Sequence, residues 1–371
     1  MTSTARPTAE RLLMIDGLRG IASLWVVLFH LWANLEKYAP DFVTAPLRWV
    51  FDNGYVGVNI FFVISGFVIA MSTGDRHCNG RYIGFFALRR SIRLDPPYWL
   101  SILVVVALAY LAAYLVPGLG DRQPPSGAQI LANVFYLQNL TGYGDINAVY
   151  WTLCLEVQFY LFFVLAIGLL QKLSASTSIS ALGQRGWLTL FIAVSGAASL
   201  ADYFNLITEQ EIWGWFVTYW FQFLLGVSAY WLWRGMISAR SYWPMVLAVA
   251  FLAFYHDRMG AMVALATLLL INLALYCGKM GQWLSNRPIQ YLGKLSYSLY
   301  LFHPIFGWSV ISLLKRYLDP HNSLNWLLMF GVGLAVSVAV AAVVHRLVEQ
   351  PCLRLCKRIV LPGPALTPQQ A

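Results

Sequence analysis

The chain has 371 residues, of which 59% are hydrophobic and only 11% are charged. Soluble domains carry roughly 25% charged residues, so this composition excludes an ordinary soluble enzyme and is typical of a polytopic membrane protein. The net charge of +9 is not concentrated in a soluble basic segment with interleaved aromatics, so it does not indicate nucleic-acid binding.

Apolar stretches long enough to cross a bilayer recur along the whole sequence. They predict an all-α fold, with about ten transmembrane helices in one bundle. In chain order, the expected spans are residues 12–33, 55–72, 97–116, 151–171, 187–203, 212–233, 242–256, 260–277, 295–314 and 325–347. Only "HDRMG" separates the seventh and eighth, so the alternative is that these two spans are merged or shifted.

The lysines and arginines predict the orientation of this bundle, because short cytoplasmic loops hold an excess of them. With the N-terminus inside, 18 of the 25 lie in inner segments, six lie in outer segments, and Arg19 lies within the first span. We therefore expect a multi-pass protein of the plasma (inner) membrane with both termini cytoplasmic. Its parts would be a cytoplasmic N-terminal segment (1–11), a transmembrane domain (12–350) and a cytoplasmic tail (351–371), with the lipid bilayer as its surroundings.

The first span contains "RGIASLWVVLFH", in which Arg19 and His30 are eleven residues apart. Eleven residues of α-helix make about three turns and rise about 16 Å, so both side chains share one face. Asp16, Ser23 and Asn34 fall on the same face. Since a charged side chain facing lipid costs several kcal/mol, this stripe predicts a polar cavity inside the bundle.

An inner layer of this cavity has the chemistry of an anion site. Arg90 and Arg93 of "ALRRSIRLDPPYW" share a helical face, and their forked donors suit phosphate. Counted from the span ends, His303 lies at the depth of Arg19 and extends the same region. Inner-face anchors that extend to lipid headgroups are the alternative explanation for the arginines. Glu349 is expected to pair with one of these arginines.

An outer layer has the chemistry of proton transfer. By the same count, His30 and Glu156 lie level near the outer side. A histidine can take a proton from a hydroxyl near neutral pH, and a neighbouring carboxylate can hold its tautomer. These residues predict a catalytic pair, although sequence alone does not establish their contact.

Six segments resemble the motifs of the acyltransferase-3 family of integral membrane acyltransferases. In chain order they are "MIDGLRGIASLWVVLFH", "GVNIFFVISGFVI", "RRSIRLDPPYWL", "WTLCLEVQFYLFF", "LGKLSYSLYLFHPI" and "VHRLVEQP". Together they cover residues 14–351 in the family's order, which makes the resemblance specific although each segment alone is weak.

The resemblance implies transfer of an acyl group, most often acetyl, from cytoplasmic acetyl-CoA to a hydroxyl of a cell-surface or lipid-linked glycan. It implies functional roles for Arg19 and His30, donor handling by Arg90 and Arg93, and a role for Glu156. Val157 stands where many members carry a second glutamate, which argues against a mechanism with paired carboxylates. The short tail does not resemble the hydrolase-like domain of some members, so we expect transfer to finish in the membrane core or through a separate partner.

Two other classes stay open at the level of sequence. A proton-coupled transporter or flippase would use aligned arginine, histidine and glutamate residues as a proton path, but internal repeats are not evident. A non-catalytic scaffold would use them only to hold helices together. The polar insertion at residues 117–150 is either a lid or acceptor-binding element, or an interfacial helix covering the bundle. The cysteines suggest neither a metal site nor a disulfide.

Overall fold

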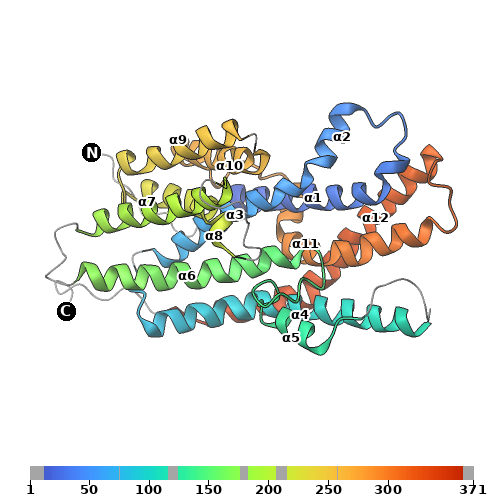
Figure 1. The fold of residues 1–371 in the computed structure, drawn as a ribbon, viewed down its shortest axis with the longest axis horizontal. Coiled ribbons are helices and arrows are strands. Elements are labelled where there is room, and N and C mark those ends of the chain that lie inside the picture. The colour runs from blue at the N-terminus through green and yellow to red at the C-terminus, as the bar shows by residue number, and fades with distance from the viewer. Residues whose placement is uncertain are drawn as a thin grey trace.

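The computed structural model describes residues 12–74, 76–115, 124–175, 183–205, 215–256 and 258–361. Within these ranges the regular structure is helical, without a β-strand, which confirms the all-α prediction (Figure 1). The expected N-terminal segment, 1–11, and residues 362–371 of the expected tail lie outside the described part of the chain.

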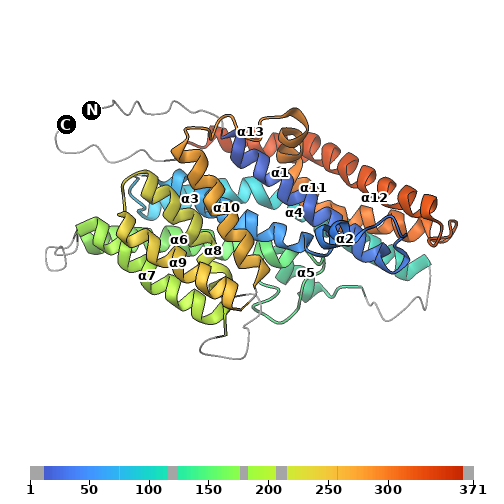
Figure 2. The same cartoon turned by 90° about the horizontal axis from the view of Figure 1, so that it is seen from above.

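Most helices run along the long axis of the bundle, with α7 and α9 on one side and α12 on the other (Figure 2). The elements are α1 (Leu13–Leu35), α2 (Ala45–Asp52), α3 (Gly57–Thr73), α4 (Gly80–Leu115), α5 (Gly127–Val134), α6 (Tyr150–Ser174), α7 (Gly183–Tyr203), α8 (Val217–Trp233), α9 (Ala239–Tyr255), α10 (Met259–Tyr276), α11 (Arg287–Leu314), α12 (Ser323–Val344) and α13 (Gln350–Arg358).

Seven of the described helical segments are long and apolar enough to cross a membrane: α1, α3, α4, α6, α10, α11 and the continuous helix that starts with α12. The other three predicted spans fall on α7, α8 and α9, of which α8 and α9 have 17 residues each. The chain therefore has the construction of a multi-pass membrane protein.

Two helices extend well beyond the apolar stretches that predicted them. The third span was expected to begin at residue 97, but α4 begins at Gly80, so its arginines lie within the helix and not in a loop. Helix α12 continues through a π-helical turn, His345–Glu349, into α13. Apolar runs mark the part of a helix that contacts apolar surroundings, whereas backbone hydrogen bonding continues into polar sequence.

Helices α1 and α11 touch backbone to backbone at two glycines. A Cβ atom on Gly20 would lie 2.6 Å from the carbonyl oxygen of Ile289, and one on Gly293 would lie 2.1 Å from that of Asp16. Both distances are shorter than any real Cβ contact. Small residues allow this close approach between transmembrane helices, where van der Waals packing drives association.

Polar contacts hold the same two helices together further along. The indole of Trp308 donates to the backbone oxygen of His30 at 2.6 Å. The ammonium of Lys315 donates to the backbone oxygen of Asn34 at 2.6 Å. Contacts therefore advance in the same direction along both helices, so α1 and α11 are parallel and their register is defined along the whole interface.

A second glycine contact places α3 in the centre of the bundle. A Cβ atom on Gly66 of α3 would lie 1.9 Å from the carbonyl oxygen of Phe223, and one on Gly226 of α8 would lie 1.9 Å from that of Val63. Helix α3 is thereby pressed against α8 while its other side faces α1 and α6. This central position lets α3 contribute to the walls of more than one cavity.

The contact between α1 and α11 predicts the effect of one added methyl group. Gly293→Ala should lower the free energy of unfolding by about 1–3 kcal/mol, because the methyl group overlaps the backbone of Asp16. Thermal unfolding in detergent measures the change. Gly331→Ala on α12 is the matched control, since its Cβ would meet no atom within 4 Å, and its stability should be unchanged or slightly higher. Wild-type stability of Gly293→Ala would contradict the close approach.

Candidate functional site

A narrow cavity with a volume of about 70 Å³ lies between α1, α3, α4, α6 and α11, and we call it the arginine cavity. Three arginines line it, Arg19 from α1 and Arg90 and Arg93 from α4, together with Glu156 from α6. Among the described lining residues, three positive charges thus face one carboxylate. An apolar membrane interior makes such an excess of positive charge costly, so the cavity is suited to an anionic ligand.

The carboxylate of Glu156 is held by two hydroxyl groups. Ser65 of α3 donates to it at 2.9 Å, and Tyr160, one turn further along α6, also donates to it. The guanidinium of Arg90 lies over the Tyr160 ring, 4.4 Å from its centroid, within the range of a cation–π interaction. Glu156 therefore orients Arg90 through Tyr160, in addition to balancing charge.

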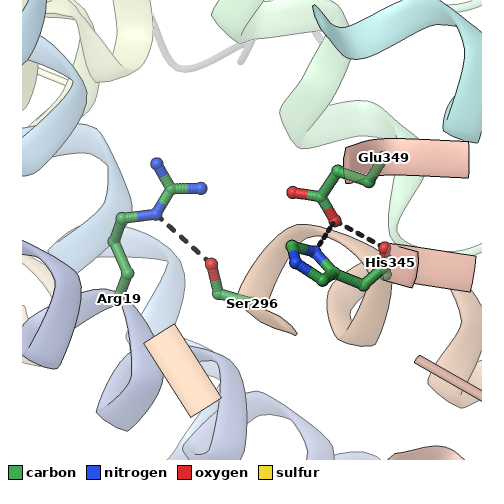
Figure 3. A network of polar contacts seen from close by, with 5 residues as sticks. Arg19, Ser296, His345 and Glu349 are labelled. Atoms are coloured by element: carbon green, nitrogen blue, oxygen red, sulfur yellow. Dashed lines mark hydrogen bonds and ion pairs between the residues drawn. The ribbon is translucent and has the colours of Figure 1, made fainter. Parts of the chain in front are cut away.

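Arg19 and Arg93 are placed by the contacts of α11. Arg19 Nε donates to Ser296 Oγ at 3.3 Å (Figure 3). The hydroxyl of Tyr297 donates to the backbone oxygen of Leu94 at 2.7 Å, which ties α4 to α11 next to Arg93. Ser296 and Tyr297, two successive residues of α11, thus position Arg19 of α1 and the Arg93 segment of α4.

Glu349 has partners other than the expected arginine. Ser298 Oγ donates to its carboxylate at 2.6 Å, and His345 Nδ1 lies 3.1 Å from the same oxygen (Figure 3). The π-helical turn that contains both His345 and Glu349 brings them together. The Ser298–Glu349 bond joins this turn, at the end of α12, to α11.

A second, larger cavity of about 440 Å³ contains His30, and we call it the histidine cavity. Ligand pockets usually have volumes of about 300–1,000 Å³, so this one is large enough for a small molecule. Aromatic side chains form a large part of its wall, among them Phe29, Tyr55, Trp151, Tyr203, Tyr219 and Tyr300. Val58, Phe62 and Tyr300 line both cavities, so the two adjoin at a common wall.

The polar insertion before α6 contributes to the histidine cavity. Ala148 and Val149 line it, and Asn147 Nδ2 donates to the backbone oxygen of Leu301 at 3.4 Å, which fastens the end of the insertion to α11. Earlier in the insertion, α5 exposes Leu131, and Phe135 directly after it is also exposed, as expected of an interfacial helix. The end of the insertion therefore lines a cavity, as a lid or acceptor-binding element would, and α5 presents apolar side chains on its surface, as an interfacial helix would.

His30 is in contact with His303. His303 Nε2 lies 3.1 Å from His30 Nδ1, and His30 Nδ1 lies 2.9 Å from the backbone oxygen of Val26. His303 is fully buried, and its Nδ1 lies 3.0 Å from the backbone oxygen of Leu299. Both rings thus point their Nδ1 atoms at carbonyl oxygens of their own helices.

These contacts determine where the ring protons lie. A carbonyl oxygen only accepts, so Nδ1 of each histidine carries a hydrogen. In the neutral form of His303, Nε2 is an acceptor for the Nδ1–H of His30, and the backbone oxygen of Val26 accepts from the same N–H. The lone pair of His30 consequently lies on Nε2, the nitrogen needed to take a proton from a hydroxyl group.

The structure reverses the expected pairings of the two layers. His30 and Glu156 were expected to lie level as a catalytic pair, but they line different cavities, and Glu156 belongs with the arginines. His303 was expected beside Arg19, but it contacts His30. The depth count for His303 was wrong because it began at the edge of the apolar run at 295, whereas α11 begins at Arg287. Glu156 is separated from His30 by the direction of its side chain, which bonds Ser65 of α3 and Tyr160.

One signal in the sequence could have found the histidine pair. Gly20 and His30 are ten residues apart, and so are Gly293 and His303. On two parallel helices that touch at these glycines, the equal spacing places the two histidines at the same depth. Tyr160 could also have been noticed, because it follows Glu156 by one helical turn.

A family profile described as an acyltransferase domain matches residues 13–346. The chain belongs to the acyltransferase-3 family. It is 25% identical over 91% of its length to the Bacillus subtilis protein named "Putative peptidoglycan O-acetyltransferase YrhL", covering 54% of that protein. It is 25% identical over 78% of its length to "O-acetyltransferase OatA" of Staphylococcus aureus, covering 49% of that protein.

The acyltransferase-3 chain thus spans about half the length of these curated relatives. No solved structure matches it. The family and the named relatives are consistent with acyl transfer as the chemistry of the two cavities.

Proposed function

We propose that this chain is a membrane O-acyltransferase. It moves an acyl group, chiefly acetyl, from cytoplasmic acyl-CoA to a hydroxyl of a cell-surface or lipid-linked glycan. The observation that carries the proposal is the junction of a cationic cavity with a cavity containing a histidine pair. The O-acetyltransferase relatives support acetyl as the group, and the peptidoglycan named for one of them supports a glycan acceptor.

We further propose ten membrane spans, with α7, α8 and α9 added to the seven long apolar helices. The excess of lysine and arginine on one side supports cytoplasmic termini in the inner membrane. In this orientation α4 enters from the cytoplasm, so its arginines face a donor arriving from that side.

The donor would bind in the arginine cavity. Arg90 and Arg93 would pair with the phosphates of acyl-CoA, because guanidinium groups match phosphate oxygens with two parallel hydrogen bonds. Arg19, on the neighbouring helix, would polarise the thioester carbonyl as negative charge develops on its oxygen. The narrow cavity, of about 70 Å³, fits an extended thioester arm better than a sugar.

The acceptor would bind in the histidine cavity. His30 Nε2 takes the proton of the acceptor hydroxyl as its oxygen attacks the thioester carbon, and the C–S bond breaks. The imidazolium then returns the proton to the departing CoA thiolate, giving the ester and free CoA. The acyl carbon has to reach the common wall of Val58, Phe62 and Tyr300 for this attack.

His303 is a positioning residue in this proposal. Its Nε2 accepts from His30 Nδ1–H, which holds the tautomer and stabilises the positive charge that His30 gains during transfer. The role resembles that of the carboxylate in a serine-hydrolase triad, with a neutral imidazole in its place. Glu156, expected to hold His30, would instead position Arg90 through Tyr160.

Variants of the histidines test the proton-transfer step. His30→Ala should lower the rate of acyl transfer by about 10²–10⁴-fold, the typical contribution of a general base, while the protein stays folded. His303→Ala should lower kcat, and His303→Gln should restore part of it, because its amide oxygen can accept from His30 Nδ1. Release of free CoA, with labelled acetyl-CoA and a glycan oligomer, measures both.

The exposed His321, which lines neither cavity, provides a matched control, and His321→Ala should behave as wild type. Near-normal transfer by His30→Ala would refute the assignment of the base. A wild-type protein that moves a solute but releases no CoA would favour a transporter.

Variants of the α4 arginines test the donor site. Arg90→Gln and Arg93→Gln should each raise the KM for acetyl-CoA about tenfold, because each removes a charged hydrogen bond worth about 1.5–3 kcal/mol. Arg81→Gln, on the exposed part of the same helix and outside both cavities, should leave KM unchanged. If all three variants had the same KM for acetyl-CoA, the donor would not bind at Arg90 and Arg93.

A further inference from the structure

The histidine cavity has the wall composition of a sugar site. Tyr55, Trp151, Tyr203, Tyr219 and Tyr300 reach it from five different segments of the chain. Aromatic rings offer flat apolar faces that match the C–H faces of a pyranose, while tyrosine hydroxyls and indole N–H groups bind sugar hydroxyls. The volume of about 440 Å³ accommodates a small ligand next to His30.

A permanent charge, that of Arg258, marks one part of this wall. Of the described residues that line the histidine cavity, Arg258 is the one with a charge at every relevant pH. It directly precedes α10, and its backbone N–H donates to the backbone oxygen of Ala253 at 2.9 Å, which fixes its place. Its guanidinium carbon lies 5.8 Å from the centroid of the Tyr203 ring, so the charge lies beside an aromatic surface.

Next to Arg258 the wall is tightly built. A Cβ atom on Gly260 would lie 2.8 Å from Asn59 Nδ2, so a side chain at this position would displace the Asn59 amide. Asn59 Nδ2 donates to Gln222 Oε1 at 2.8 Å, and this bond fixes the orientation of its amide. Asn59 itself lines the cavity. The arginine is therefore part of an ordered wall.

We infer that the histidine cavity binds an acceptor sugar that carries an anionic group, a carboxylate or a phosphate, and that Arg258 pairs with this group. The inference rests on the proposed function and adds the chemical class of the acceptor. Aromatic walls alone would bind neutral sugars equally well. The forked guanidinium at one side selects acceptors with oxyanions and turns their hydroxyl groups toward His30.

The test compares acceptors that differ in charge alone. The first is an N-acetylglucosamine–N-acetylmuramic acid oligomer with free lactyl carboxylates, and the second is its neutral methyl ester. A prenyl-diphosphate-linked N-acetylglucosamine is the third, so that a sugar carboxylate and a lipid-linked phosphate are distinguished. Detergent-purified full-length protein with acetyl-CoA is assayed for release of CoA and for labelled product.

Arg258→Gln should raise the KM for an anionic acceptor about tenfold, as expected for the loss of one charged hydrogen bond, and leave the KM for the methyl ester unchanged. The anionic acceptor whose KM rises in Arg258→Gln shows whether Arg258 pairs with a sugar carboxylate or with a lipid-linked phosphate. Arg48→Gln is the control, since Arg48 is exposed on α2 and lines neither cavity. An equal change for charged and neutral acceptors, or no change for either, would overturn the inference.

A binding measurement separates this inference from the proposed function. Equilibrium dialysis without donor measures the Kd of the labelled carboxylate oligomer and of the phosphate-linked sugar. The Kd of the anionic ligand should be about tenfold lower for the His30→Ala variant than for the double variant His30→Ala/Arg258→Gln. If this difference appears while wild-type protein transfers no acyl group to any acceptor, the proposed function fails and the acceptor class stands. If transfer occurs without the difference in Kd, the inference about Arg258 fails.

Discussion

The backbone contact between α1 and α11 determines the geometry of both cavities. Gly20 and Gly293 let the two helices touch near one end, and the contact defines their register. Ten residues further along each helix, the register brings His30 against His303. At the glycine end it brings Arg19 against Ser296. One close approach thus places His30 in the histidine cavity and Arg19 in the arginine cavity.

The chemistry of the two cavities is divided by charge. The arginine cavity holds three cations and one carboxylate, and a negatively charged donor would balance the excess. The histidine pair lies in the other cavity, and the proposed mechanism starts from neutral rings, so that His30 can take a proton. A carboxylate next to neutral His30 would be a buried charge without a cation to pair with, and its desolvation would destabilise the bundle. Placing Glu156 with the arginines avoids that cost, and neutral His303 still fixes the tautomer of His30.

The sequence predicted the all-α class, which the described residues confirm, and it pointed to residues that line the two cavities. Which of these residues contact one another depended on the structure. Charged residues in apolar spans are costly, so their presence alone pointed to Arg19, His30 and Glu156. Pairing requires the true helix ends and the register between helices. Those ends lie in polar sequence, as at Gly80 of α4, and the register is set by glycine contacts between distant segments. Arg258 could not be singled out from the sequence, because it lies in "HDRMG", a short connection between two predicted spans. Only the tertiary structure places it in the wall of the histidine cavity.

An experimental structure with acetonyl-CoA, a thioether analogue that keeps a carbonyl next to the sulfur-bound methylene and cannot transfer it, tests the account most directly. We expect the nucleotide phosphates against Arg90 and Arg93 and the acyl carbonyl at the wall formed by Val58, Phe62 and Tyr300. His30 Nε2 should face that carbonyl from the other cavity. Phosphates bound away from α4, or a His30 ring separated from both His303 and the acyl group, would contradict the account.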